Sequence, residues 1–293
     1  MRVHPDCLPC FARQIHSVCA LLPASPAQRL DWSRQAMWAV LEADWERAPP
    51  EVSGLVQARL CELSGVEDPY LEAKRLQNDY LLARLPALEA RVRAAPDPLA
   101  AALRLSMAGN LIDLGVNPEV SAGDIDAAIE EAFALGLDRA LVERFEAEVA
   151  GARRILFLAD NSGEIVFDRL LLEALPREKI VVAVRGRPIL NDVTLREAEQ
   201  VGLLGRVEVV ANGAGVPGTA LAQCSEELRR LFDSADLVIS KGQGNFETLF
   251  GLEKPIWFLF KIKCAVVQEA LGEPLGSLVF HRQAPGAGAT AVA

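Results

Sequence analysis

The sequence predicts an α/β protein in which an all-α amino-terminal subdomain precedes a Rossmann-like, mostly parallel sheet. Two observations support this prediction. Up to about residue 150 the apolar residues recur at helical spacing, and from Ile155 onward short apolar runs alternate with helical patterns. Such alternation indicates parallel strands joined by right-handed crossovers. We therefore expect a helical subdomain over 1–150, an α/β core over 151–283 and a frayed tail rich in Pro, Gly and Ala over 284–293.

Six stretches of the amino-terminal half have apolar residues at the spacing of a helix. The expected helices cover 11–22, 32–45, 70–85, 99–112, 125–135 and 140–149. Prolines punctuate these stretches, at Pro23, Pro49, Pro50, Pro86, Pro96, Pro98 and Pro118. The sequence has no internal repeat.

Five apolar runs of the second half are typical of buried strands. They cover 155–159, 179–184, 206–211, 236–240 and 255–260, and helices are expected over 165–175, 195–201, 219–232, 246–252 and 264–271. Each run ends in polar or charged residues. Ligands of open α/β sheets bind at the carboxyl ends of the strands. We therefore expect one edge of the sheet to hold a cation site beside an anion site.

Bulk properties exclude several classes of function. The chain has 293 residues, is 51% hydrophobic and carries a formal net charge of −10. This charge argues against broad binding to nucleic acid or to an anionic membrane, because such partners require a basic surface. The first residues lack the apolar core of a signal peptide, and no apolar run is long enough to span a membrane. Six cysteines in a chain of this length are not a disulfide framework, so we expect a cytoplasmic protein.

The first candidate site is a metal site formed by Asp160, Asn161 and Asp192. The pair Asp160-Asn161 ends one predicted strand, and Asp192 follows the next strand along the chain. Their side chains can converge because the strands are successive. Carboxylate and amide oxygens suit Mg²⁺, Mn²⁺ or Ca²⁺. The alternative is that both aspartates only cap the following helices.

The second candidate site is a phosphate cradle over Lys241-Gly-Gln-Gly-Asn245. The glycines Gly242 and Gly244 allow backbone N–H groups to approach an anion, the following helix offers its positive end, and Lys241 adds a charge. The alternative is a tight turn with a solvated lysine.

A third pattern, Gly213-Ala-Gly215-Val-Pro-Gly218, matches the G-x-G-x-x-G signature of dinucleotide-binding loops. That signature expects an acid at the end of the next strand. Here Asp236 opens the next strand and Lys241 closes it, which disfavours a dinucleotide.

Further polar residues allow two interpretations each. The amino terminus concentrates potential zinc ligands, namely His4, Cys7, Cys10, His16 and Cys19. They indicate either a zinc site or buried core cysteines. Asn110 and Asp113 share one helical face, as do Asp68, Lys74 and Asn78. Each group either covers the site from the helical subdomain or has a local structural role.

Four motifs resemble those of the DUF89 or ARMT1-like family of metal-dependent damage-control phosphatases. They are Asp160-Asn-Ser-Gly-Glu164, Arg185-Gly-Arg-Pro-Ile-Leu-Asn-Asp-Val-Thr194, Lys241-Gly-Gln-Gly-Asn-Phe-Glu247 and Lys263-Cys264. The start at Cys7, Asp68-Pro-Tyr70 and Gly109-Asn-Leu-Ile-Asp113 resemble its prokaryotic branch. One departure is Cys264-Ala265, where the family pattern has Cys-Pro.

The resemblance implies a helical subdomain joined to a Rossmann-like core, and a divalent metal, Mn, Co, Ni or Mg, on Asp160, Asn161 and Asp192. It also implies Lys241 at the phosphate, and hydrolysis of phosphate monoesters of sugars or related small metabolites. The alternatives are a SAM-dependent carboxyl methyltransferase or another cofactor-binding enzyme that uses the loop 213–218, and a metal- or metabolite-binding protein without turnover.

We expect the metal to bind a phosphate oxygen and a water, with Asp160 as its ligand. Attack by Asp160 itself is disfavoured because Ser162 stands where a second acid would be expected. Glu164 is the candidate general base. The expected phosphate and substrate contacts are Lys241, Gly242, Gly244, Asn245, Arg185, Asn110 and Asp113.

Overall fold

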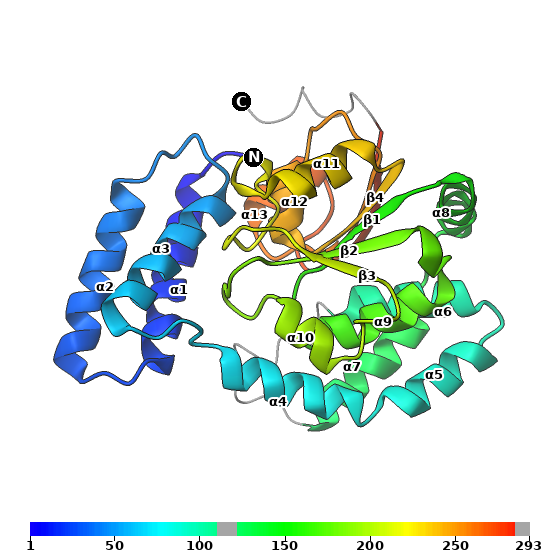
Figure 1. Ribbon diagram of the computed structural model, residues 1–293, viewed down its shortest axis with the longest axis horizontal. Coiled ribbons are helices and arrows are strands. Elements are labelled where there is room, and N and C mark those ends of the chain that lie inside the picture. Colours follow the sequence, from blue (N-terminus) through cyan, green and yellow to red (C-terminus); the bar gives the residue numbers. More distant parts are fainter. Residues whose placement is uncertain (110–121, 285–293) are drawn as a thin grey trace.

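The computed structural model describes residues 1–109 and 122–284 and contains one six-stranded sheet (Figure 1). Its strands are β1 (Ile155–Leu158), β2 (Ile180–Val184), β3 (Glu208–Ala211), β4 (Leu237–Lys241), β5 (Ile256–Lys261) and β6 (Leu278–Gln283). The order is β3-β2-β1-β4-β5-β6; the first five strands in this order are parallel and β6 is antiparallel to β5. This confirms the predicted Rossmann-like, mostly parallel sheet. The strand order reverses between β1 and β4, the position where such sheets bind ligands.

Alternate residues of each strand face two separate apolar cores. Phe157 belongs to the core on one face, and its neighbour Leu158 belongs to the core on the other. The first core contains residues of α4 (Leu71–Leu82), α5 (Leu85–Ala94), α6 (Pro98–Ala108), α7 (Ala122–Ala134), α8 (Arg139–Gly151), α9 (Glu164–Ala174) and α10 (Leu195–Gln200). The second contains residues of α11 (Glu226–Ser234), α12 (Gln243–Leu249) and α13 (Ala265–Leu271).

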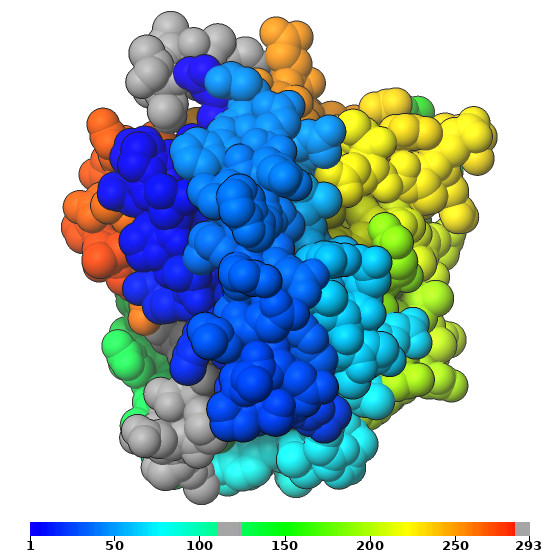
Figure 2. All heavy atoms as spheres, turned by 90° about the vertical axis from the view of Figure 1, so that its left-hand side faces the viewer, coloured from blue at the N-terminus to red at the C-terminus, as the bar shows by residue number. Residues whose placement is uncertain are grey.

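The first three helices form a unit with an apolar core of its own. This three-helix unit consists of α1 (Leu8–Leu21), α2 (Pro26–Leu41) and α3 (Pro49–Ser64). It stands beside the sheet in Figure 1, and Figure 2 looks onto it, in blue. The helices of residues 1–150 thus form two packing groups, since α4 to α8 share their core with the sheet. A domain boundary at residue 150 stays a prediction.

Several elements differ from the sequence prediction. Helices α3 and α5 are additional to the predicted ones. Pro49 and Pro86 suggest interruptions, but both lie in the first turn, where the fixed proline φ suits a helix. The edge strand β6 was also not expected. Helix α11 begins at Glu226 rather than at residue 219, because the Ser225 side chain accepts a hydrogen bond from Leu228 N and caps it.

Short 3₁₀ helices occur between the longer elements of the described chain. They cover Pro5–Cys7, Arg177–Lys179 and Leu221–Gln223. The helix expected over 99–112 ends at Ala108, and residues 110–112 lie outside the described part. Of the predicted tail, only Ala284 is described. Within the described residues, every helix is too short or too polar to cross a membrane.

Candidate metal and phosphate site

Two loops meet where the strand order reverses. Asp160 follows β1, Gly242 follows β4, and these strands are neighbours in the sheet. Gly242 has φ +80°, and a Cβ atom built there would overlap the Asp160 carboxylate. Glycine is therefore required at 242 both for the backbone conformation and for the close approach of Asp160.

The predicted metal residues Asp160, Asn161 and Asp192, here called the metal trio, lie together at this edge. Asn161 and Asp192 form an isolated antiparallel bridge, and Val193 N donates to Asp160 O at 2.9 Å. Asn161 Nδ2 lies 2.7 Å from Asp160 Oδ2. The loops after β1 and β2 are thus paired by their backbones, which brings the three side chains to one place.

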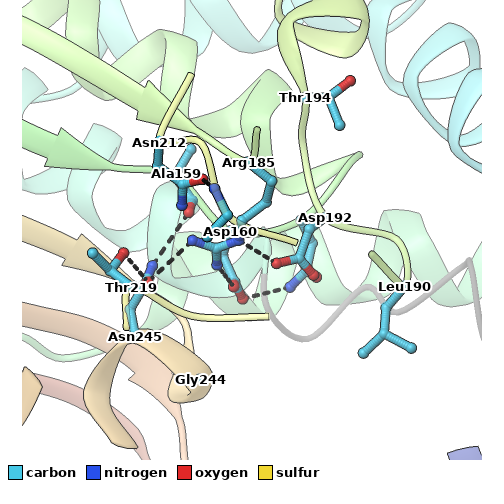
Figure 3. Close-up of polar contacts among 12 residues, drawn as sticks. Ala159, Asp160, Arg185, Leu190, Asp192, Thr194, Asn212, Thr219, Gly244 and Asn245 are labelled. Carbon is cyan, nitrogen blue, oxygen red and sulfur yellow. Dashed lines mark hydrogen bonds and ion pairs between the residues drawn. The ribbon is translucent and has the colours of Figure 1, made fainter. Parts of the chain in front are cut away.

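Arg185 lies between the two aspartates of the trio (Figure 3). Its Nη2 is 3.2 Å from Asp160 Oδ1, and its Nε is 2.5 Å from Asp192 Oδ2. A third nitrogen, Nη1, donates to Asn245 Oδ1 at 3.2 Å. The guanidinium is thus directed at residues of the site, and a direct contact between Arg185 and substrate stays a prediction.

Burial and mutual repulsion disfavour the charged form of the two aspartates. Desolvation, followed by the charges of Asp192 and Glu164, raises the pKa of Asp160 well above its ordinary value. Desolvation also raises the pKa of Asp192, although Arg185 opposes that shift. A divalent cation would favour the charged form of both groups.

The trio fits a hard cation by its donor chemistry. It offers two carboxylates and an amide oxygen, the ligand types preferred by Mg²⁺ and Mn²⁺. Asp160 is 8% exposed and Asn161 is half-buried, so an ion could reach them. The fit depends on Asn161, since no cluster of three or more His, Cys, Asp or Glu side chains suited to a metal occurs in residues 1–109 and 122–284.

Lys241 lies below this edge, in a separate buried cluster. Its side chain is fully buried, and Nζ lies 2.5 Å from both Glu164 Oε1 and Asp168 Oδ1 and donates to Ser106 O at 2.8 Å. Burial alone would lower the pKa of Lys241, but the charges of Asp168 and Glu164 outweigh it and raise that pKa. The alternative of a solvated lysine in a turn is therefore wrong, whereas contact between Lys241 and phosphate stays a prediction.

The rest of the Lys241 loop packs tightly against its neighbours. Asn245 is fully buried; its Oδ1 accepts from Thr219 Oγ1 at 2.7 Å and its Nδ2 donates to Lys241 O at 2.7 Å. A Cβ atom at Gly244 would overlap the Pro217 carbonyl oxygen. Asn245 therefore organises the loop, and its proposed contact with substrate is not tested.

Close packing also explains two of the three glycines of the pattern 213–218, Gly213 and Gly218. A Cβ atom at Gly213 would lie 2.9 Å from Ser225 N, and one at Gly218 would lie 2.6 Å from Gly244 O. These glycines are needed for contacts between loops. The geometry thus gives them a role that involves no dinucleotide.

Helices of the amino-terminal half hold both loops of the metal trio. Asn78 Oδ1, on α4, accepts from Gly163 N at 2.6 Å, and Gln57 Oε1, on α3, accepts from Leu190 N at 2.9 Å. Lys74, also on α4, pairs with Asp68 at 2.7 Å and with Glu197 at 3.2 Å. The expectation that Lys74 and Asn78 share a face is confirmed, and that face meets the α/β core.

Sequence reasoning missed Gln57, Asp168 and Ser106. Asp168 carried a signal, because it is an acid inside the apolar helix pattern 165–175. Gln57 and Ser106 carried none. The predicted contacts Asn110 and Asp113 lie outside the described residues.

The amino-terminal cysteines do not converge on a metal site within the described residues. Cys19 is buried in the core of the three-helix unit, whereas Cys10 is exposed. Cys7 is half-buried, and this burial raises the pKa of its thiol to about 11. His4 Nδ1 accepts a hydrogen bond from Asp6 N. The interpretation as a buried core cysteine therefore holds for Cys19, whereas zinc at Cys7 and Cys10 stays a prediction.

A cavity of about 480 Å³ adjoins the site. It lies between the chain leading into α4, at Glu67 and Asp68, and the loop that carries Arg185 and Thr194. Carboxylates and Arg196 line it together with apolar residues such as Val66 and Leu71. It offers room for a small polar molecule beside Arg185.

Comparison with known proteins gives consistent matches over nearly the whole chain. A family model described as the damage-control phosphatase ARMT1-like domain matches residues 3–279. An uncharacterized protein of Methanocaldococcus jannaschii is 32% identical over 97% of this chain and 96% of its own length. Proteins named damage-control phosphatase from Pyrococcus horikoshii and Archaeoglobus fulgidus are each 31% identical, over 96% and 95% of this chain respectively and 98% of their own lengths. The crystal structure of a DUF89 family protein from Pyrococcus horikoshii superposes with a TM-score of 0.85 at 29% identity, covering 96% of this chain and 99% of that one.

Proposed function

The chain belongs to the damage-control phosphatase ARMT1-like family, and we propose that it is a metal-dependent phosphatase acting on phosphate monoesters of sugars or related small metabolites. The observation that carries this proposal is the convergence of Asp160, Asn161 and Asp192 where the strand order reverses. Relatives named damage-control phosphatases support the reaction class. The donor chemistry of the trio supports a divalent ion such as Mn, Co, Ni or Mg.

In this proposal the trio holds the metal, which polarises the phosphate and orients a water when bound. Asp160 acts as a ligand, and its place between Gly242 and Arg185 fixes its carboxylate before the metal binds. Arg185 offsets part of the negative charge of Asp160 and Asp192. The residue two positions after Asp160 is Ser162, so the chain lacks the second acid that attack by Asp160 would require.

The phosphate contacts are proposed for the loop that follows β4. Gly242 N already donates to Leu259 O at 3.1 Å, so the backbone N–H proposed to face an anion is that of Gly244. Lys241 supplies a fixed positive charge below this turn. Direct contact with a phosphate would require its ammonium to leave Glu164 or Asp168, because it lies 2.5 Å from each. The cavity beside Arg185 is the proposed place for the remainder of the substrate.

Metal dependence is the first test. The chain is freed of metal with a chelator, and phosphate release from p-nitrophenyl phosphate is measured before and after Mn²⁺ or Co²⁺ is added. We expect activity to disappear on chelation and to return with either ion. Full activity in protein shown by elemental analysis to be free of metal would refute the proposal. A screen of phosphorylated metabolites under the same conditions then identifies the substrate.

A further inference from the structure

The backbone is strained next to the proposed metal ligand Asp192. Leu190, two residues earlier, has φ +45°, and it is the one non-glycine residue with positive φ in the described ranges. A side chain with a Cβ atom is disfavoured in this region, and such strain persists only where the surroundings enforce it. Something must therefore hold Leu190 in place.

Two contacts with the three-helix unit hold Leu190. Its N–H donates to Gln57 Oε1 at 2.9 Å, across 133 residues of sequence, and its side chain packs against the core of α1 to α3. Gln57 is 1% exposed. Its Nε2 has no hydrogen-bond partner among the described residues, so the described hydrogen bond of this amide is the one to Leu190. Burial of an amide with an unpaired donor is unfavourable. The described contact that stabilises the Gln57 amide is therefore the hydrogen bond from Leu190 N to its acceptor oxygen.

The constraint on Leu190 passes directly to the metal trio. Asp192 N donates to Ile189 O at 3.0 Å, so Leu190 lies within the turn that presents Asp192. Asn191 O accepts from Ser162 N at 2.8 Å, which ties the same turn to the loop of Asp160 and Asn161. A shift at Leu190 would therefore move Asp192 relative to Asp160.

We propose that Gln57 is a positioning residue, which sets the carboxylate of Asp192 for the metal by holding the strained backbone of Leu190. The three-helix unit, which has an apolar core of its own, thereby becomes part of the metal-binding apparatus. This inference rests on the proposed function, in which Asp192 is a metal ligand. Its structural part, that Gln57 orders the turn 186–194, does not.

The test compares Gln57→Met, which keeps the size and removes the acceptor, with Gln57→Glu, which keeps an acceptor oxygen. Ser53→Ala is the matched control. Ser53 lies one turn earlier on α3, is buried and donates to Gln14 Oε1 at 2.7 Å, within the three-helix unit. Each variant is titrated with Mn²⁺, assayed for kcat and KM, and examined by hydrogen exchange of the peptides 186–194 and 237–245.

Gln57→Met should weaken Mn²⁺ binding about 10- to 100-fold, the usual effect of removing a group that orients a metal ligand. Its kcat at saturating Mn²⁺ should fall less than its metal affinity, and exchange should accelerate in 186–194 but not in 237–245. Gln57→Glu should restore most of the affinity, and Ser53→Ala should lose stability without losing affinity. If Gln57→Met fails to fold, Leu190→Ala takes its place, because it removes the packing contact and should also weaken Mn²⁺ binding.

Wild-type Mn²⁺ affinity in Gln57→Met, or an equal loss in Ser53→Ala, would overturn the inference. A wild-type chain that neither binds Mn²⁺ nor releases phosphate would instead overturn the proposed function. Hydrogen exchange then still decides the structural part, because it requires neither metal nor turnover. Unchanged exchange of 186–194 in Gln57→Met would show that Gln57 does not order the turn.

Discussion

Two buried clusters at one edge of the sheet have the same formal composition, two carboxylates and one base. The Arg185 cluster contains Asp160 and Asp192, and its ion-pair distances are 3.2 and 2.5 Å. The Lys241 cluster contains Glu164 and Asp168, and both of its distances are 2.5 Å. Composition alone would assign the two clusters the same role.

Their surroundings differ. The Arg185 cluster lies on loops beside half-buried Asn161, and Asp160 keeps 8% of its surface exposed. The Lys241 cluster is closed by helices, with the lysine fully buried and hydrogen-bonded to Ser106 O on α6. Both clusters contain a cationic side chain, but the first keeps some exposed surface beside Asn161, so a divalent ion is proposed at the first cluster and not at the second. A candidate metal site therefore differs from an internal ion pair in its exposure to solvent and in its spare ligand atoms, and not in its net charge.

The largest expected effect concerns Asp160. Asp160→Ala should reduce Mn²⁺ affinity and kcat/KM by at least about 100-fold, because it removes a direct ligand and not only a neighbour of one. The chain should remain folded, since burial already disfavours the charge of this carboxyl. Metal titration, kinetics and thermal unfolding of the variant test this. If Asp160→Ala kept both its Mn²⁺ affinity and its turnover, the metal would bind elsewhere. The Arg185 cluster would then be an internal ion pair like the Lys241 cluster.

Lys241 gives the next largest effect. Lys241→Met leaves two buried carboxylates without their cation, so the free energy of unfolding should fall by about 3–5 kcal/mol. Loss of its charge near the phosphate should reduce kcat/KM by about 10²–10³, while Mn²⁺ affinity stays within a few-fold. Lys254→Met, at a lysine outside both clusters, is the control. A stable variant with full turnover would mean that neither the buried pair nor the phosphate role of Lys241 is real.

The sequence predicted the Arg185 cluster better than the Lys241 cluster, for a physical reason. Asp160 and Asp192 follow apolar runs, and parallel strands place such ends on one edge, so a local pattern implied a distant contact. The partners of Lys241 lie on helices, where Ser106 offers its backbone carbonyl to Lys241 and its hydroxyl to Asp168. No local pattern predicts which carbonyl a lysine will reach. The link between Gln57 and Leu190 was hidden likewise, since it depends on a backbone angle and on how the three-helix unit packs.

Proline and strand signals show the same limit in the fold. Pro49 and Pro86 each lie in the first turn of a helix, but a proline in the sequence alone does not distinguish the first turn from an interruption. The edge strand β6 pairs antiparallel with β5, and the alternation of strands and helices that predicts the parallel order does not predict this strand. Periodicity therefore predicted the layers, and caps and edges required the structure.

A smaller effect should distinguish the clusters by pH. Burial raises the pKa of Asp168 to about 7, against about 3.9 for an unfolded aspartate. Between these values the folded chain binds more protons than the unfolded chain, so the free energy of unfolding should fall as pH rises from 4 to 7. Asp168→Asn should flatten this dependence in urea titrations at pH 5 and 7.5, whereas Asp233→Asn, at an exposed position, should not. If the free energy of unfolding of Asp168→Asn depended on pH as in the wild type, Asp168 would be charged over this whole pH range, and its ion pair with Lys241 would hold it so.

The smallest expected effect concerns Glu164, which joins the two clusters. Its Oε1 lies 2.5 Å from Lys241 Nζ, and its Oε2 accepts from Asn161 Nδ2 at 3.3 Å. A general base would lose about 10²–10⁴ in rate on conversion to an amide. Both carboxylate oxygens of Glu164 already have partners, Lys241 and Asn161, so we expect Glu164→Gln to lose less than about tenfold in kcat/KM. The amide keeps an acceptor for Lys241, so the loss should appear mainly in Mn²⁺ affinity, through Asn161. A 10³-fold fall in kcat at saturating Mn²⁺ would instead identify Glu164 as the general base, and the Lys241 cluster would then take part in the chemistry.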